Sequence, residues 1–166
     1  ISVRPINHLQ LYGSFFLDEV KFSRFKLSEP ENNPISYLVG FNWSGWPIDG
    51  LSLKGEFMRS YIACYTHSID VLTWASNSYN MGHYMGDNAQ SIYAELAYRP
   101  VRGLLLKLSY TNDMKYNSYS YLRDNISETI AQKPFDHCIY RNDEIRFDGI
   151  YEAHPNMYLR LSIGYN

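Results

Sequence analysis

The chain has 166 residues, enough for one ordinary domain, and its composition of 45% hydrophobic and 16% aromatic residues argues against intrinsic disorder. A formal net charge of −2 argues against a nucleic-acid-binding protein. No segment approaches the roughly 18 apolar residues of a transmembrane helix, whereas transmembrane β-strands need only about 9–11 residues each.

The start of the chain and its cysteines give limited information. The sequence begins with Ile1 and shows no signal peptide, so we interpret it as a mature product or as a fragment of a longer protein. Two cysteines do not define a disulfide scaffold. Cys64 and Cys138 are expected to be unpaired thiols, although an oxidising compartment would allow them to pair.

Seven segments show the period-2 alternation of β-strands, and helical periodicity is almost absent. In each segment one face is apolar and the opposite face carries the polar and charged residues. In chain order, these predicted strands are residues 9–18, 36–44, 51–58, 91–99, 104–111, 144–152 and 157–166. The sequence therefore predicts an all-β chain.

The predicted connections alternate strictly between short and long. Short connections contain proline and lie at residues 46–50, 100–103 and 153–156, whereas long polar connections lie at roughly 19–34, 61–89 and 112–137. A proline followed by alternating leucines recurs four times, and each is expected to end one strand at a tight turn, where a missing N–H is tolerated. The four are Pro5, Pro47, Pro100 and Pro155.

This alternation predicts an antiparallel up-and-down sheet with all tight turns at one end and all long loops at the other. Such an arrangement is typical of an outer-membrane β-barrel, and the aromatic residues near the strand ends suit its interfacial girdles. A soluble β-sandwich is the alternative, although three loops of about 25 residues are unusual in compact soluble domains. Since single-chain bacterial barrels normally have an even strand number, we interpret residues 1–166 as a segment of one larger transmembrane barrel domain.

The charged residues on the polar faces of the predicted strands would line the interior of such a barrel. Their signs are mixed, which indicates a hydrated interior held by ion pairs. The alternative interpretation is a polar channel whose selectivity these charges tune. The predicted lining residues are Lys54, Glu56, Glu95, Arg99, Lys107, Glu144, Arg146, Asp148 and Arg160.

The long connection at 61–89 is the densest candidate for a binding site. It combines aromatic rings with Asn and Asp side chains, and this mixture suits the CH faces and hydroxyl groups of a sugar. The alternative is a loop folded on itself, with aromatic residues packed inward and Asn and Asp forming turns. The candidate ligand-binding residues are Tyr65, His67, Trp74, Tyr79, His83, Tyr84, Asp87 and Asn88.

Catalytic and metal-binding motifs are absent from the sequence. It contains no HExxH, CxxC or GxSxG motif. His137 and Cys138 are adjacent, but neighbours in a strand point to opposite faces, so they are not expected to form a nucleophile pair. We predict no catalytic residues, no metal and no cofactor.

Two motifs resemble a known family. "YTH" at 65–67 and "GHYMGDNAQSIY" at 82–93 resemble the Tyr-Thr-His and Gly-His-x-x-Gly-x-Asn signature of Wzi-type capsule-assembly proteins and related Bacteroidota barrels, and "LYGSFFLDEVKFSRF" at 11–25 resembles a strand and acidic-aromatic loop of the same group. The positions that match the signature are Tyr65, Thr66, His67, Gly82, His83, Gly86 and Asn88. The resemblance implies a large antiparallel barrel in the outer membrane of a Gram-negative bacterium, where it binds surface polysaccharide and helps to attach the capsule. Members of the family are several times longer than this chain.

The sequence thus predicts a non-enzymatic outer-membrane β-barrel segment that handles capsular polysaccharide. The alternative is a porin, or a structural barrel subunit of an export or uptake complex, and an outer-membrane hydrolase is a third class. The expected partners are the lipid bilayer, surface polysaccharide and further strands or chains that complete the barrel, with no nucleic acid. The sequence leaves open which glycan or solute is handled, the total strand number, the state of the pore and the oligomeric state.

Overall fold

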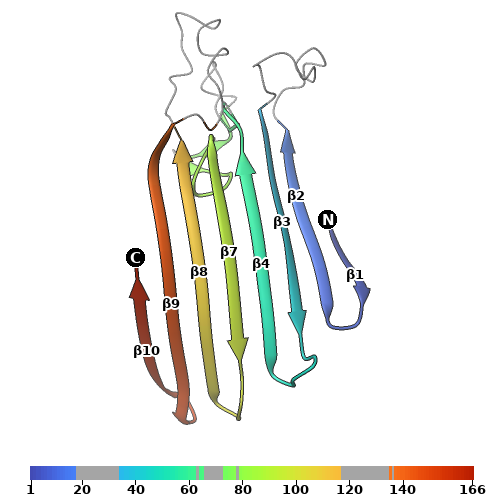
Figure 1. Cartoon of the computed structure of the whole chain (residues 1–166), viewed down its shortest axis with the longest axis vertical. Coiled ribbons are helices and arrows are strands. Elements are labelled where there is room, and N and C mark those ends of the chain that lie inside the picture. The colour runs from blue at the N-terminus through green and yellow to red at the C-terminus, as the bar shows by residue number, and fades with distance from the viewer. Residues whose placement is uncertain (18–33, 63, 66–72, 78, 117–134, 136) are drawn as a thin grey trace, which may run out of the picture.

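The computed structural model describes residues 1–17, 34–62, 64–65, 73–77, 79–116, 135 and 137–166. Within these residues the chain is all-β, with ten strands (Figure 1). Eight of them form one antiparallel sheet, and β5 (Ala75–Ser76) and β6 (Tyr79–Asn80) form a small separate hairpin. The described part of the chain has no helix long and apolar enough to cross a membrane.

The main sheet has up-and-down topology. Its spatial order is β1 (Ser2–Ile6), β2 (Leu9–Leu17), β3 (Ile35–Ser44), β4 (Leu51–Ser60), β7 (Ala89–Tyr98), β8 (Leu104–Tyr116), β9 (Cys138–His154) and β10 (Met157–Tyr165). The short connections lie at one end of the sheet, and the strand ends that lead into the long connections lie at the other, as the sequence predicts (Figure 1). The all-β antiparallel part of the predicted fold class is therefore confirmed.

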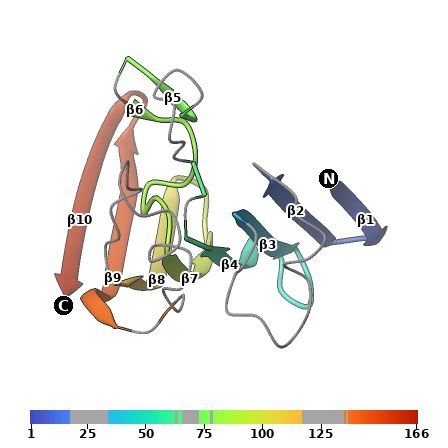
Figure 2. The same ribbon diagram turned by 90° about the horizontal axis from the view of Figure 1, so that it is seen from above.

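The sheet is curved and open. Seen from above, it curls so that β9 and β10 turn toward one side, and the β5–β6 hairpin lies on that concave side (Figure 2). β1 and β10 are the two edges of the sheet and do not pair with each other. The described strands therefore form a trough rather than a closed barrel.

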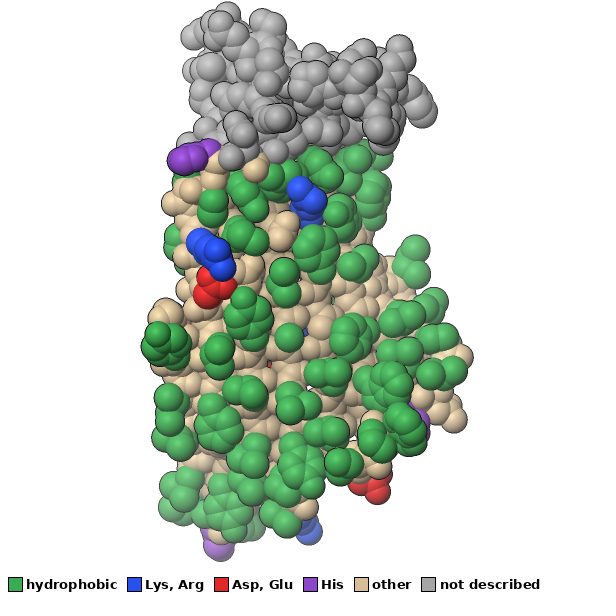
Figure 3. Space-filling model, viewed as in Figure 1, with side chains coloured by type: hydrophobic (Ala, Val, Ile, Leu, Met, Phe, Trp, Pro, Cys, Tyr) green, Lys and Arg blue, Asp and Glu red, His purple; other side chains and the backbone are tan. Residues whose placement is uncertain are grey.

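The convex face is apolar along its length. Pairing aligns rows of apolar side chains across the strands, for example Leu53 opposite Leu96, Leu96 opposite Leu108, and Leu108 opposite Phe147. Hydrophobic side chains cover this face between the two ends of the sheet (Figure 3). Among the described residues, many of these apolar side chains are exposed, and Leu108, for example, is 48% exposed.

The tight turns depend on residues that adopt positive φ. Gly50 has a φ of 79° and its carbonyl accepts a hydrogen bond from the Arg99 N–H at 2.9 Å. A Cβ at this position would lie 2.5 Å from the Arg99 carbonyl oxygen, so both the conformation and the close approach require glycine. The turn between β3 and β4 thereby contacts the turn between β7 and β8.

The main sheet has one strand more than the seven predicted, because β1 was not predicted. This strand is only five residues long and contains Pro5, which the sequence analysis placed at a tight turn. Proline is accepted here because Pro5 lies between Val3 and Ile6, where the register of β1 against β2 is irregular. The turn follows instead at Asn7 and at His8, whose φ is 74°.

Two strands also extend further toward the loop end than predicted. β8 continues to Tyr116, so the connection predicted at 112–137 starts later, and β9 begins at Cys138, six residues before the predicted strand at 144. Register is maintained from Leu104 opposite Tyr151 to Lys115 opposite Tyr140. Asn112 pairs with Asp143 in this extension. Because such polar residues are typical of loops, the sequence did not predict them as part of the strands.

Candidate functional site on the concave face

The concave face carries ion pairs between neighbouring side chains. Nζ of Lys54 lies 3.1 Å from Oε1 of Glu56 on β4, and Nζ of Lys107 lies 2.7 Å from Oε2 of Glu95 across β8 and β7. Further along, Arg146 lies 2.5 Å from Glu144, and Arg160 lies 3.2 Å from Asp148. Opposite charges that face each other across strands support the register of the sheet.

A tyrosine crosses a glycine to reach this charged face. The Tyr12 hydroxyl on β2 donates a 2.6 Å hydrogen bond to Oε1 of Glu56 on β4, two strands away. The ring passes over Gly40 of the intervening strand, where a Cβ would lie 2.6 Å from Cζ of Tyr12. Gly40 therefore leaves the space that lets Tyr12 and Glu56 meet.

The segment from Tyr79 to Asn88 is tied to the loop end of the sheet. The Ser60 hydroxyl donates to the Gly86 carbonyl at 2.6 Å, and Nζ of Lys115 contacts a carboxylate oxygen of Asp87 at 3.1 Å and also its backbone carbonyl. Asn88 is buried, with a φ of 45°, and its side-chain oxygen accepts a hydrogen bond from the Phe135 N–H. These contacts hold the segment over the concave face.

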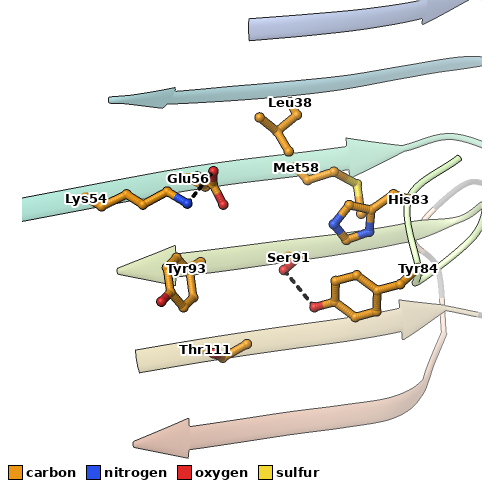
Figure 4. A pocket seen from close by; sticks show the side chains of 9 residues that line it. All are labelled: Leu38, Lys54, Glu56, Met58, His83, Tyr84, Ser91, Tyr93 and Thr111. Atoms are coloured by element: carbon orange, nitrogen blue, oxygen red, sulfur yellow. Dashed lines mark hydrogen bonds and ion pairs between the residues drawn. The ribbon is translucent and has the colours of Figure 1, made fainter. Parts of the chain in front are cut away.

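A pocket of about 340 Å³ forms where this segment approaches the sheet (Figure 4). His83 and Tyr84 come from the segment and point toward the strands, and side chains of β3, β4, β7 and β8 form the floor. The volume is at the lower end of the roughly 300–1,000 Å³ range of small-molecule sites. The floor residues are Leu38, Lys54, Glu56, Met58, Ser91, Tyr93 and Thr111.

Tyr84 is held by a carboxylate of the sheet. Its hydroxyl donates to Oδ1 of Asp113 at 2.7 Å, and the Ser91 hydroxyl donates to the same oxygen at 2.6 Å. Burial, with the neighbouring Asp113 carboxylate, raises the pKa of Tyr84 to about 12, so its hydroxyl keeps its proton. Tyr84 lines the pocket, and 70% of the residue is exposed.

His83 is an uncharged hydrogen-bonding group in this pocket. Burial lowers the pKa of His83, because desolvation outweighs the opposing charges of Asp113 and Glu56. Its Nδ1 accepts a hydrogen bond from the Met85 N–H at 3.3 Å. Since Nδ1 is the acceptor, the proton of the neutral ring is on Nε2, which is a donor.

The predicted ligand-binding residues divide into three groups. His83 and Tyr84 line the pocket, and Trp74 and Tyr79 are exposed elsewhere in the connection between β4 and β7. The other described candidates hold structure: Tyr65 is buried and donates to the Ser36 hydroxyl at 2.6 Å, while Asp87 and Asn88 tie the segment to the sheet. His67 and Thr66 lie outside the described residues.

The predicted lining residues lie mainly on the concave face. Eight of the nine are in strands β4, β7, β8, β9 and β10, and they form the ion pairs given above. Arg99 instead follows the end of β7 and is exposed in the turn. Glu95 is paired with Lys107.

The floor of the pocket was not predicted from the sequence. Ser91, Tyr93 and Thr111 are in predicted strands, but it was the loop that was considered for ligand binding. Register supplies the missing information, because Ser91 pairs with both Met58 and Asp113, and Tyr93 pairs with both Glu56 and Thr111. The available signal was the run of polar residues at alternate positions of neighbouring strands.

The described part of the chain contains no cluster of potential metal ligands and no disulfide. No three His, Cys, Asp or Glu residues there are close enough to hold a metal ion. Cys64 is buried, Cys138 is exposed, and the two are not joined to each other. The pocket offers hydrogen-bonding and apolar groups for a ligand rather than a set of metal ligands.

Comparisons with protein-family models, with curated proteins and with solved structures give no match to this chain.

Proposed function

We propose that this chain is a segment of a non-enzymatic outer-membrane β-barrel protein that binds surface polysaccharide on its concave face. The proposal that the protein lies in a membrane rests on where its apolar side chains are: few of them are buried, and many are exposed on the convex face. Among the described residues only five hydrophobic ones are buried, namely Met58, Cys64, Tyr65, Ala89 and Ala97, while the leucine rows of the convex face are exposed. An antiparallel sheet in water normally covers its apolar face with a second layer.

The dimensions of the convex face fit a bilayer. The apolar positions of β8 run from Leu104 to Tyr110, and those of β2 run from Leu9 to Leu17. At about 3.3 Å per residue these stretches are roughly 20–27 Å long, close to the apolar band of about 25 Å on transmembrane barrels. Lipid is therefore the partner we propose for this face.

The two ends of the apolar band carry interfacial residues. At the turn end, the rings of Trp43 and Trp46 stack with centroids 5.7 Å apart. Toward the loop end, Asp143 accepts hydrogen bonds from Asn112 at 2.6 Å and from Arg141 at 2.6 Å, and these polar groups follow the last apolar row. Aromatic residues and then charged groups at the boundary suit the headgroup region.

The open edges of the sheet support the proposal that further strands complete it. The outer sides of β1 and β10 pair with no strand of the described residues. Unpaired backbone groups in hydrocarbon cost several kcal/mol each, so a sheet that spans a membrane must close. We propose that additional strands, of the same polypeptide or of other chains, pair with these edges.

Polysaccharide binding rests on the pocket beneath His83 and Tyr84. It combines an exposed aromatic ring, apolar side chains and hydrogen-bonding groups, which suits the faces and hydroxyl groups of a sugar. It also lies on the loop side of the sheet, where a barrel of this orientation meets the cell exterior.

Single-tryptophan variants in vesicles of brominated phosphatidylcholine would test this proposal. Variants that retain only Trp43 or only Trp46 are expected to be quenched by bromine in the acyl chain, whereas a variant that retains only Trp74, on the long segment, is expected to stay bright. Binding of surface polysaccharide to the protein in the same vesicles would test the proposal that the concave face binds polysaccharide. A protein that stays monomeric in water without detergent, with no quenching of Trp43, would contradict the membrane proposal.

A porin or structural barrel subunit is the second candidate. The ion pairs of mixed sign along the concave face favour it, because such charges tune the selectivity of a water-filled interior. In planar bilayers, Lys54→Met or Arg146→Met would then change ion selectivity. Selectivity changes without polysaccharide binding would favour this candidate over the first.

A further inference from the structure

The pocket contains charges, but each cation lies beside a carboxylate. Lys54 and Glu56 are 3.1 Å apart, with their side chains 39% and 25% exposed, so both still reach the pocket. The next pair along the face, Lys107 and Glu95, is also neutral as a pair. His83 is uncharged, so the groups that a ligand meets have no net charge.

Some hydrogen-bonding groups of the pocket already donate to other side chains of the protein, and others remain for a ligand. The hydroxyls of Tyr84 and Ser91 donate to Asp113, and the hydroxyl of Tyr93 donates to Oε2 of Glu95 at 2.6 Å. These groups are oriented by the sheet and have their donors in use.

The available groups include donors and an acceptor close together. Both Tyr12 and Lys54 contact Oε1 of Glu56, and among the described residues no group donates to its Oε2. Lys54 has further N–H donors, His83 has its Nε2–H, and Thr111 has a hydroxyl that forms no hydrogen bond with the described residues. A donor beside an acceptor matches two adjacent hydroxyls of a sugar, each of which donates and accepts.

One wall of the pocket is apolar. Leu38 and Met58 lie on the side away from Tyr84, and the exposed ring of Tyr84 faces the pocket from the segment above (Figure 4). A sugar ring has CH-rich faces and a hydroxyl-rich edge. The apolar side chains and the Tyr84 ring suit the faces, and the Lys54–Glu56 pair suits the edge.

We propose that this pocket selects an uncharged sugar unit, with adjacent hydroxyls bound by Lys54 and Glu56 and a CH face on the Tyr84 ring. The inference rests on the proposed polysaccharide-binding function and specifies its ligand class. A hexuronate would bring its carboxylate next to Glu56, whose charge is already matched by Lys54, so no cation is left for a second anion. The pocket volume of about 340 Å³ has room for a mono- or disaccharide unit of a longer chain.

The test is calorimetric titration of the protein in nanodiscs with neutral hexose oligosaccharides and with hexuronate oligosaccharides of matched linkage and length. We expect the best neutral oligosaccharide to bind at least about tenfold more tightly than its hexuronate counterpart, which corresponds to about 1.4 kcal/mol. Glu56→Gln should weaken the neutral ligand about tenfold and narrow or reverse the preference, because it removes the acceptor charge that repels a carboxylate.

Glu144→Gln is the matched control. Like Glu56, which pairs with Lys54, Glu144 pairs with a cation two residues away on its own strand, Arg146, and lies on the concave face, but it does not line the pocket. This variant should bind both ligands as the unmodified protein does. A Glu144→Gln effect equal to that of Glu56→Gln would overturn the assignment to this pocket.

The remaining outcomes separate the two proposals. Equal binding of neutral and acidic oligosaccharides, or preference for the hexuronates, would overturn the ligand class while leaving polysaccharide binding in place. No binding of any oligosaccharide or whole surface polysaccharide, by protein whose Trp43 is quenched by brominated lipid, would overturn both the ligand class and the polysaccharide part of the proposed function.

Discussion

The convex and concave faces consist of alternate residues of the same strands, yet their chemistry is opposite. On β8, Leu108 lies in an exposed apolar row, whereas the adjacent Ser109 lies between Glu95 and Arg146 on the charged side. Side chains of the charged face hydrogen-bond and pair with one another, and those of the apolar face have no second layer of described residues over them. This difference is the observation behind our proposal that the convex face contacts lipid.

The largest expected effect comes from a charge on the convex face. Leu108→Arg should lower the free energy of unfolding by about 2–4 kcal/mol, the cost of arginine near the middle of a bilayer on a barrel surface. Ser109→Arg, one residue away on the other face, should cost about 1 kcal/mol or less. Urea unfolding in phospholipid vesicles measures both. If Leu108→Arg proves as mild as Ser109→Arg, the two faces do not differ as proposed.

Glycine packing on the concave face gives the next largest effect. Gly40→Ala places a Cβ 2.6 Å from the Tyr12 ring, so the ring must move and its bond to Glu56 is lost. We expect a loss of about 1–3 kcal/mol in the same unfolding assay. Gly149→Ala is the control, because its Cβ would meet nothing closer than 3.8 Å. Equal losses for the two variants would show that the Tyr12–Glu56 contact is not what Gly40 protects.

The hydrogen bond that holds the segment to the concave face should have a smaller effect. Tyr84→Phe removes the donor to Asp113, and since Tyr84 is largely exposed we expect a local loss of about 1 kcal/mol. Amide hydrogen exchange of Met85 and Gly86 would report it as faster exchange. Tyr79→Phe, at a residue that is 77% exposed, should leave those amides unchanged, and a similar acceleration there would argue against the anchor.

The smallest effect is expected from pH. Because burial lowers the pKa of His83 below the ordinary histidine value near 6.5, the unfolded segment binds more protons between that value and the folded pKa. Stability of the segment should therefore be complete above about pH 6.5 and fall as the pH falls through that window. Protonation also removes the Nδ1 acceptor of the Met85 N–H, while Asp113 and Glu56 partly offset the new charge. Hydrogen exchange at pH 7.5 and pH 5.5 would measure the change, and His83→Gln should abolish it.

The strands could be predicted from the sequence because their two faces differ so clearly. Period-2 alternation places Leu104, Leu106 and Leu108 on one face whatever their partners are, and proline with glycine marks the tight turns. β1 could not be predicted in this way, because it has five residues and contains Pro5. Its place at the edge is a property of the sheet and not of its own sequence.

The candidate site was predictable only in part. His83 and Tyr84 stood out as aromatic residues in a polar loop, and they do line the pocket. Tyr65 and Asn88 stood out for the same reason, yet they are buried anchors, because composition does not distinguish a side chain that binds from one that holds a loop. The floor at Ser91, Tyr93 and Thr111 depends on strand register, which single-sequence periodicity does not give.

The most direct test of the central claim is a nitroxide scan along β8 in lipid vesicles, with Cys64→Ala and Cys138→Ser as the background. Each position from Leu104 to Thr111 is labelled in turn, and its collision rates with oxygen, which concentrates in lipid, and with a water-soluble nickel chelate are measured. A lipid-facing convex surface predicts strict alternation. Oxygen access should peak at positions 104, 106, 108 and 110, and chelate access should peak at 105, 107, 109 and 111. Chelate access at the even positions equal to that at the odd positions would contradict a lipid-facing convex surface.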